Sequence, residues 1–301
     1  MRGKKVRFAG VLAASLALVL TGCGGGGENR LATGGTDAQA EVDANAQFEP
    51  GTTMAALQQQ GTIRVGTKVD QPLFGLKGLD GQMQGFDVEI AEIVAGKLGI
   101  APENIEWVET PSKTREEVLE QGRVDMVVAT YTINDARKER ISFAGPYYQA
   151  GQDLMIKADD TSITGPESLR PAGAKVCSVI GSTPAEEIKK YVDASNLVLF
   201  DVYSKCADAL RTGQVQAVTT DNVILLGLVE KSGGEFKLVE KPFTEEPYGI
   251  GIKKGDVAFC EFINQSLTEA AQDGAYEAAW KATAGTVSER TPQLPEFDPC
   301  S

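Results

Sequence analysis

The stretch that decides the fold is VVATYTINDARKERISFAGPYY, residues 127–148. It begins inside an apolar run, 124–129, that has the length and composition of a buried strand. Thr130 and Thr132 follow this strand directly, and a charged run that contains Arg137 comes next. Open α/β sheets bind their ligands outside the carboxyl ends of their strands, so the two threonines are candidates for a binding site. Taken alone, the charged run is typical of a helix face that contacts solvent.

Strands alternate with helices on both sides of this stretch. Before it, hydrophobic spacing predicts a short helix at 54–60, a strand at 62–66, a helix from Phe86 to Leu98, a strand at 105–108 and a helix at 114–120. After it, the same spacing predicts a strand at 175–180, a helix at 184–192, a strand at 197–202, a helix at 204–212 and a strand at 215–219. Such alternation is typical of mostly parallel sheets.

The series after the stretch indicates a second α/β lobe that is inserted into the first. Extended runs at 153–156 and 247–252 flank it and predict two crossover segments between the lobes. We therefore expect lobe 1 to comprise residues 54–152 and 247–301, and lobe 2 to comprise residues 153–246. The expected fold class is α/β, with two lobes of mixed, mostly parallel sheets flanked by helices.

The N-terminal 22 residues have the features of an export signal. Four cations precede an apolar run from Phe8 to Leu20, which is shorter than the ~20 residues that a membrane-spanning helix needs. The LTGC segment that follows resembles a bacterial lipobox, which implies that residues 1–22 are removed and that Cys23 carries diacylglycerol. The lipid would hold the protein on the extracytoplasmic face of the cell membrane. The alternative is an ordinary secretory signal in which Cys23 is incidental.

The segment that follows the signal, 23–53, is expected to be a flexible tether. It is rich in Gly, Ala, Thr, Gln and acidic residues and contains a single aromatic residue, Phe48. Such a segment cannot bury enough apolar surface to fold by itself.

The composition excludes several classes of function. Without the signal peptide, the chain has 25 basic and 42 acidic residues, a net charge of −17, so nucleic acid is not expected as a partner. The sequence contains no histidine, which excludes a Ser-His-Asp triad, a histidine-ligated metal site and a histidine pH switch. We therefore expect neither a metal nor a cofactor, and most hydrolase chemistry is disfavoured.

Four cysteines remain once Cys23 is assigned to the lipid, and four cysteines allow three pairings. Cys177 lies in a predicted strand and Cys206 in a predicted helix about 30 residues later, a spacing at which consecutive β-α-β elements come into contact. We therefore predict the pairs Cys177–Cys206 and Cys260–Cys300. A metal site is the competing interpretation, but no C-x-x-C pair is present and the compartment favours oxidation.

The stretch 127–148 resembles the polar-amino-acid receptors of ABC importers, which are type II periplasmic-binding proteins of solute-binding protein family 3. The resemblance extends over roughly residues 60 to 285 and includes four further segments: Gly85–Ile90, Gly181–Thr183, Thr219–Asp221 and Tyr248–Gly251. It implies a monomeric, non-enzymatic receptor whose two lobes close on an amino acid and deliver it to an ABC permease.

The resemblance also implies which residues hold the backbone of the amino acid. Arg137 occupies the position that grips the α-carboxylate, and Thr132 would add hydroxyl and N–H donors. Thr130 would accept from the ammonium group, and Asp221 matches the acid that pairs with it. Thr183 precedes Pro184 at a predicted helix start, where its N–H and the helix dipole favour an anion. The alternatives are that Asp221 caps the next helix and that Thr183 is only a neighbour of an N-cap.

Three further residues bear on the class of ligand. Lys68, Ser112 and Arg115 align with the positions that glutamate/aspartate receptors use for the distal carboxylate, whereas glutamine receptors of this class tend to have an acid and an aromatic residue there. Two cations would offset the cost of burying a second carboxylate. The alternative for Lys68 and Arg115 is a surface salt bridge. The lysine departs from the arginine of these receptors, which leaves asparagine, glutamine and aspartate open beside glutamate.

Two other functions fit the same resemblance. The receptor could report to a membrane sensor kinase instead of a permease. It could also be a periplasmic dehydratase of the same fold, although without histidine an acid-base mechanism would depend on Asp or Glu, and the matched acid, Asp221, is assigned to the ammonium group.

Overall fold

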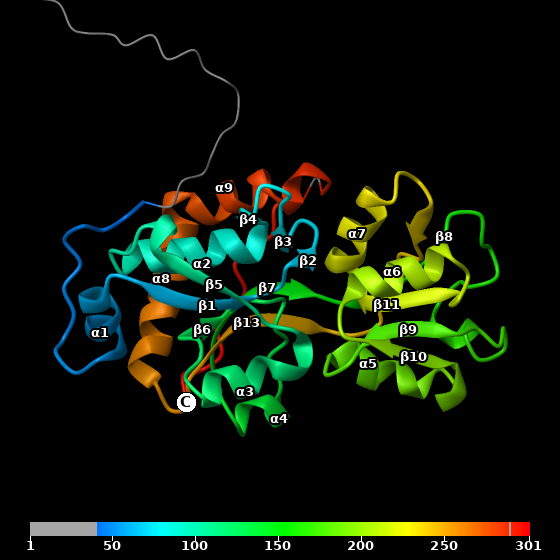
Figure 1. Cartoon of the computed structure of the whole chain (residues 1–301), viewed down its shortest axis with the longest axis horizontal. Helices are drawn as coiled ribbons and strands as arrows, with labels where there is room; N and C mark the ends of the chain where they lie inside the picture. The colour runs from blue at the N-terminus through cyan, green and yellow to red at the C-terminus, as the bar shows by residue number, and fades with distance from the viewer. Residues whose placement is uncertain (1–40, 289) are drawn as a thin grey trace, which may run out of the picture. The chain divides into compact units, whose positions relative to one another are not determined.

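The computed structural model describes residues 41–288 and 290–301, and Cys23 with the predicted signal peptide lies outside them (Figure 1). Two five-stranded sheets form the frame of the described chain. The first has the order β5 (Ile105–Glu109), β1 (Ile63–Thr67), β6 (Met126–Val127), β13 (Glu246–Ile252) and β7 (Ser142–Ala150). β1 pairs in parallel with β5 and β6, whereas β13 pairs antiparallel with β6 and β7. Four strands therefore run in one direction and β13 runs in the opposite one.

Helices cover both faces of this sheet and complete lobe 1 (Figure 1). They are α1 (Thr53–Gln60), α2 (Phe86–Lys97), α3 (Arg115–Glu120), α4 (Asp135–Lys138), α8 (Val257–Asp273) and α9 (Ala275–Ala282). Met126 and Val128 face the apolar core beside α2, α8 and α9, whereas Val127 and Ala129 face the core beside α3. The continuous apolar run in the sequence is therefore explained by burial on both faces.

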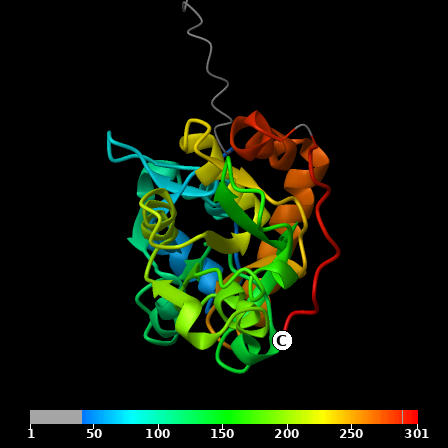
Figure 2. The same cartoon turned by 90° about the vertical axis from the view of Figure 1, so that its right-hand side faces the viewer.

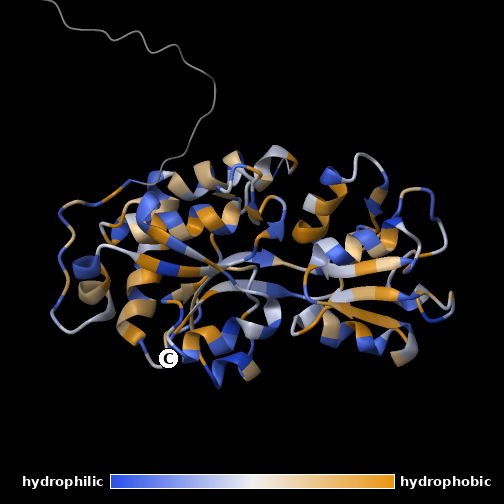
Figure 3. Cartoon of the chain, viewed as in Figure 1, coloured by the Kyte–Doolittle hydropathy of each residue, from blue (hydrophilic) through white to orange (hydrophobic). Residues whose placement is uncertain are grey.

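The second sheet forms lobe 2 and repeats the arrangement. Its order is β10 (Leu197–Phe200), β9 (Val176–Val179), β11 (Ala217–Asp221), β8 (Gln152–Lys157) and β12 (Phe236–Leu238). β9 pairs in parallel with β10 and β11, while β8 is antiparallel to β11 and β12. Figure 3 shows apolar residues along β9 and β10 and hydrophilic ones on the surrounding loops. The helices of this lobe are α5 (Thr183–Glu187), α6 (Tyr203–Arg211) and the largely apolar α7 (Asn222–Lys231).

The prediction of an α/β fold with two lobes and mixed, mostly parallel sheets is confirmed. A small antiparallel sheet of β2 (Asp70–Gln71), β3 (Gly75–Lys77) and β4 (Met83–Gln84) was not predicted. The predicted helix 184–192 is divided into α5 and the 3-10 turn Ile188–Lys190. Further 3-10 turns lie at Pro102–Asn104, Ser112–Thr114, Pro166–Ser168, Ala194–Asn196 and Ala284–Thr286.

The last part of the predicted tether is packed on lobe 1, in contrast to the prediction. The ring of Phe48 lies edge-on against Phe262 of α8, with 5.4 Å between the ring centroids. The N–H of Asp43 donates to the carbonyl of Gly96, and the side chain of Gln58 donates to the carbonyl of Ala46. Lobe 1 supplies the apolar surface that the segment lacks by itself.

Two short segments connect the lobes and lie against each other. Gly151 separates β7 from β8, and Thr244 lies just before β13. The N–H of Gln152 donates to Oγ1 of Thr244 at 3.0 Å, and the N–H of Phe243 donates to the carbonyl of Gln152 at 2.9 Å. A Cβ at Gly151 would come within 2.8 Å of the carbonyl oxygen of Thr244, so this close approach requires glycine.

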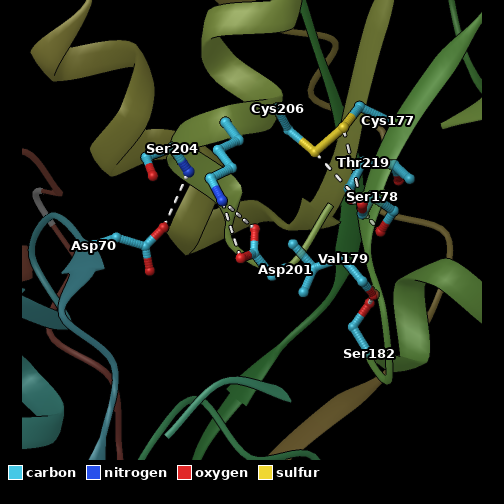
Figure 4. Close-up of a disulfide and its surroundings, with 10 residues drawn as sticks. Asp70, Cys177, Ser178, Val179, Ser182, Asp201, Ser204, Cys206 and Thr219 are labelled. Atoms are coloured by element: carbon cyan, nitrogen blue, oxygen red, sulfur yellow. Dashed lines mark hydrogen bonds and ion pairs between the residues drawn. A yellow bond between two sulfur atoms is a disulfide. The ribbon is translucent and has the colours of Figure 1, made fainter. Parts of the chain in front are cut away.

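Both predicted disulfides are present. Cys177 of β9 is bonded to Cys206 of α6, which fastens that helix to the sheet of lobe 2 (Figure 4). Cys260 of α8 is bonded to Cys300, and the C-terminal segment runs beside this helix (Figure 2). No helix among the described residues is long and apolar enough to cross a membrane.

Candidate functional site

Residues of both lobes line one small pocket at the carboxyl ends of the strands. Its empty volume is about 210 Å³. Six of the eight predicted site residues line it, and the other contributors are Ser182, Pro184, Tyr203, Thr220 and Ile224; the six are Ser112, Arg115, Thr130, Thr132, Thr183 and Asp221. Lys68 and Arg137 lie behind this lining, in contact with Ser112 and Thr132 respectively.

The threonine segment after β6 is held in a strained conformation. Thr130 has a φ of 45°, which is uncommon for a β-branched residue. Its N–H donates to Oδ2 of Asp87 at 2.8 Å, and Oδ1 of the same carboxylate accepts from the hydroxyl of Tyr147 at 2.6 Å. Oγ1 of Thr130 donates to the side chain of Gln71 at 3.0 Å. β6 is shorter than the predicted strand because the chain leaves the sheet here, and strain of this kind is typical of functional sites.

Tyr131 supports both site arginines. The guanidinium carbon of Arg115 lies 4.1 Å from the centroid of the Tyr131 ring, and that of Arg137 lies 4.9 Å from it. NH1 of Arg115 also donates to the carbonyls of Ala129 and Thr130 at 3.1 and 3.3 Å. The ring and the carbonyls stabilise the two guanidinium groups in place.

Arg137 is buried and therefore does not belong to the solvated face that Glu139 and Arg140 of the same charged run form. Its side chain forms an ion pair with Glu116 at 3.2 Å and donates to the carbonyls of Thr132 at 2.6 Å and Gly181 at 3.2 Å. Burial lowers its pKa to about 10, with Arg115 as a second cause. Because Gly181 belongs to lobe 2, Arg137 also connects the lobes.

Lys68 and Arg115 form a buried pair of cations, and neither forms a surface salt bridge within the part of the chain that the structure describes. Nζ of Lys68 donates to Oγ of Ser112 at 2.8 Å, and Nε of Arg115 donates to the carbonyl of the same serine at 3.3 Å. Burial lowers the pKa of Lys68 well below its usual value, and the neighbouring Arg115 lowers it further. An anion beside this pair would offset both the cost of burying Lys68 and its repulsion by Arg115.

Asp221 lies on the opposite lobe and does not cap α7, because its side chain accepts no hydrogen bond from the first turn of the helix. Oδ2 accepts from the hydroxyl of Tyr248 at 2.6 Å, whereas buried Oδ1 has no hydrogen-bond partner among the described residues. Burial raises the pKa of Asp221 to about 8, and the nearby Glu246 raises it further. Arg115 and Arg137 act in the opposite direction but less strongly than burial, and no cation forms an ion pair with Asp221 among the described residues.

Glu246 belongs to the site but was missed in the sequence. Its Oε2 accepts from the hydroxyls of Thr132 at 2.7 Å and Thr183 at 2.6 Å. The sequence around Glu246 does not mark it as a site residue, because strands commonly carry charged residues at their ends. The helix dipole predicted at Thr183 is weak, since α5 has only five residues.

Within residues 41–288 and 290–301, no group of three or more Cys, Asp or Glu residues could hold a metal ion. The chemistry of the pocket is instead that of hydrogen bonds and unlike charges.

Known proteins are similar to this chain in sequence along most of its length. The "Glutamate-binding protein GluB" of Corynebacterium efficiens is 40% identical over 245 residues, which cover 78% of this chain and 83% of that protein. The "ABC transporter glutamine-binding protein GlnH" of Bacillus subtilis is 35% identical over 279 residues, which cover 92% of this chain and 96% of that protein.

Solved structures agree in fold. An ancestral arginine-binding protein bound to glutamine matches with a TM-score of 0.69 and 36% identity, over 73% of this chain and 96% of that chain. The L-cysteine receptor of Neisseria gonorrhoeae matches with a TM-score of 0.73 and 28% identity, over 81% of this chain and 100% of that chain. The family model "Bacterial extracellular solute-binding proteins, family 3" matches residues 63–282. The chain therefore belongs to family 3 of the bacterial extracellular solute-binding proteins.

Proposed function

We propose that this protein is the extracytoplasmic binding lipoprotein of an ABC importer and that its solute is L-glutamate. The observation that carries the proposal is the distribution of charge in the pocket. The buried cations Lys68 and Arg115 lie on lobe 1, and the unpaired oxygen of Asp221 lies on lobe 2. A solute with an anionic end and an ammonium group satisfies both.

The cations favour a dicarboxylic amino acid over its amide. Lys68 and Arg115 are almost fully buried and form no ion pair within the described part of the chain, although Asp70 and Asp87 are near enough to raise the pKa of Lys68. A distal carboxylate would pair with them directly, whereas an amide would bring no charge to offset the cost of burying them. The relatives named for glutamate and for glutamine make these two solutes the main candidates, and the charge of the pocket favours glutamate.

Arg137 keeps donors for the α-carboxylate. A guanidinium group has five N–H donors, and three are engaged by Glu116, Thr132 and Gly181. Two donors therefore remain for a bidentate contact, which is the geometry at which arginine binds carboxylates best. Tyr131 stacks against the guanidinium group and would keep it aligned.

The remaining elements of the proposal concern location and partner. Acylated Cys23 would anchor the receptor, and the segment between Cys23 and the packed Phe48 would let it reach a permease. The protein acts as a solute-binding protein and not as an enzyme, in line with its family. A membrane sensor in place of the permease would be identified by co-purification with the loaded receptor.

Calorimetry with glutamate, glutamine, aspartate and asparagine tests the choice of solute. We expect glutamate to bind most tightly. Lys68→Met should lower the affinity for glutamate more than the affinity for glutamine, because only glutamate carries a charge at its distal end. Removing one partner of a buried pair costs about 3–5 kcal/mol, which is at least a hundredfold in affinity.

Arg123→Met is the matched control, because Arg123 is an exposed cation close to α3 that pairs only with Glu117 at 3.1 Å among the described residues. It should leave all affinities unchanged. Equal losses for glutamate and glutamine in Lys68→Met would contradict the assignment of the distal subsite, and no binding of any of the four would overturn the proposed function.

A further inference from the structure

Glu246 occupies an unusual position, because one buried carboxylate contacts threonines of both lobes. It is the first residue of β13, just after the second crossover, and only 3% of it is exposed. Oε2 accepts from Thr132 of lobe 1 and Thr183 of lobe 2, and Oε1 accepts from Thr244 in the crossover at 2.9 Å. Three hydroxyls therefore converge on one side chain.

These contacts determine what the pocket hydroxyls can do. A threonine hydroxyl has one hydrogen, and an ionised carboxylate can only accept. The hydrogens of Thr132 and Thr183 therefore point at Glu246, and both oxygens turn lone pairs toward other neighbours. The two oxygens lie 3.3 Å apart and form a small acceptor surface in the pocket.

The negative charges of Glu246 and Asp221 support the same role as the hydrogen bonds that Glu246 accepts. Glu246 is close enough to Asp221 to raise its pKa, so both carboxylates contribute negative potential at this end of the pocket. The opposing cations Lys68 and Arg115 lie at the other end, beside Ser112. Arg137 lies at the same end as Glu246, since it donates to the carbonyl of Thr132 and interacts with Glu246. This end of the pocket therefore offers a guanidinium group to the α-carboxylate of the solute, and carboxylates and hydroxyl acceptors to its ammonium group.

We propose that Glu246 is a positioning residue for the ammonium group of the solute: it fixes the hydroxyls of Thr132 and Thr183 as acceptors and, by holding both, stabilises the closed arrangement of the lobes. The inference rests on the proposed function and deepens it. It also revises the expectation that the Thr132 hydroxyl donates to the α-carboxylate, which leaves that role to N–H groups and Arg137.

The consequence is selectivity for amino acids over their deaminated counterparts. Glutarate has the two carboxylates of glutamate and lacks the ammonium group, so it meets acceptors and negative potential where glutamate brings donors. The ratio of the two affinities isolates what Glu246 contributes through the ammonium group. A purely structural contribution would change both affinities by the same factor.

The test measures this ratio by calorimetry in the wild type, Glu246→Ala, Glu246→Gln and the control Glu245→Gln. Glu245 is the preceding acid and is exposed. We expect Glu246→Ala to lower the ratio of glutamate to glutarate affinity at least tenfold. Glu246→Gln, which keeps an acceptor oxygen and loses the charge, should lower it less, and the control should leave it unchanged.

A double-mutant cycle links the effect to the hydroxyls. If Glu246 acts through Thr183, then Thr183→Val should lower the ratio in the wild type and have a much smaller effect in Glu246→Ala. Additive losses would show that Glu246 acts in another way and would overturn the proposal. Circular dichroism identifies a variant that fails to fold, and in that case Glu246→Gln takes the place of Glu246→Ala.

The two proposals fail in different ways. If the wild type binds glutamate but the ratio is unchanged in Glu246→Ala and Glu246→Gln, the role of Glu246 is overturned and the proposed function stands. If the wild type prefers glutamine, aspartate or asparagine, the same ratio is measured with that amino acid and its deaminated counterpart. If it binds none of them, both proposals are overturned.

Discussion

Asp221 is a carboxyl group whose protonation depends on whether the pocket holds a cation. Burial raises its pKa to about 8, so at pH 7 the group carries a proton when no ammonium is beside it. A solute ammonium next to the unpaired Oδ1 stabilises the ionised form and lowers this pKa again. Binding and proton release are thereby coupled at a single residue.

We predict that Asp221 contributes the release of close to one proton to amino-acid binding at pH 7 and that, over the range in which Lys68 stays protonated, affinity rises with pH up to about 8. The sign follows because the unliganded group is protonated below its raised pKa and must lose the proton to pair with the ammonium. Calorimetry in buffers of different ionisation enthalpy measures the protons released. Asp208→Asn, at an exposed acid of α6, is the control. Binding heats that do not depend on the buffer would contradict the coupling.

The disulfide between β9 and α6 is an element-scale constraint on lobe 2. Cys177 and Cys206 are 29 residues apart and fully buried, and the sulfur of Cys206 contacts the carbonyl of Ser178 in the same strand (Figure 4). A cross-link over a loop of this length restricts the unfolded chain. It also fixes α6, whose first residue, Tyr203, lines the pocket.

Replacement of both cysteines by alanine should lower the free energy of unfolding by roughly 3–4 kcal/mol in the loop-entropy model. Guanidinium denaturation of the oxidised wild type and the variant measures the difference. The double variant Cys260→Ser, Cys300→Ser provides a comparison in lobe 1, because it removes a disulfide without touching the pocket. A loss below 1 kcal/mol for the Cys177/Cys206 variant would show that this cross-link adds little.

At the scale of elements, the sequence predicted most strands and helices because their apolar periodicity reflects burial. The apolar run at 124–129 indicated a strand correctly, but it could not show that the chain leaves the sheet at Thr130, because that turn depends on the distant carboxylate of Asp87. The packing of Phe48 was missed for the same reason. Its partner ring belongs to Phe262, more than two hundred residues away.

The whole molecule is held in one arrangement by contacts that cross between the lobes. Oδ2 of Asp70, in the small sheet of lobe 1, accepts from the N–H of Ser204 near the start of α6 at 3.0 Å (Figure 4). Arg137 reaches Gly181, and Glu246 holds Thr183. Asp70 is absent from the pocket lining, so it acts on binding from outside the pocket, through the arrangement of the lobes and through its charge, which raises the pKa of Lys68.

Asp70→Ala should weaken glutamate binding by about tenfold or more, because hydrogen bonds to charged groups contribute about 1.5–3 kcal/mol. Small-angle scattering should show a larger radius of gyration for this variant at subsaturating glutamate, and calorimetry gives the affinity. Asp80→Ala, at an exposed acid between β3 and β4, should change neither quantity. Unchanged affinity in Asp70→Ala would show that this contact does not contribute to closure.

The candidate site was predictable where its residues belong to segments that carry the family resemblance, including the distant Lys68, Ser112, Arg115, Thr183 and Asp221. Thr130, Thr132 and Arg137 belong to one segment, and its pattern indicated them together. Glu246 was out of reach, because its role depends on a lobe crossover that brings it to Thr132 from 114 residues away. The sequence shows that residue 246 is a glutamate, but it does not show which distant residues the fold brings into contact with it.

The attachment of both ends of the described chain, near Phe48 and at Cys300, to one helix has a consequence for the use of this protein as a biosensor. Phe48 packs on Phe262, and Cys300 is bonded to Cys260, so α8 of lobe 1 fixes the described chain at either end. A fluorophore or surface linker added near either end would therefore travel with lobe 1. A second dye on an exposed residue of lobe 2, such as Lys189, would then report the angle between the lobes as a change in energy transfer.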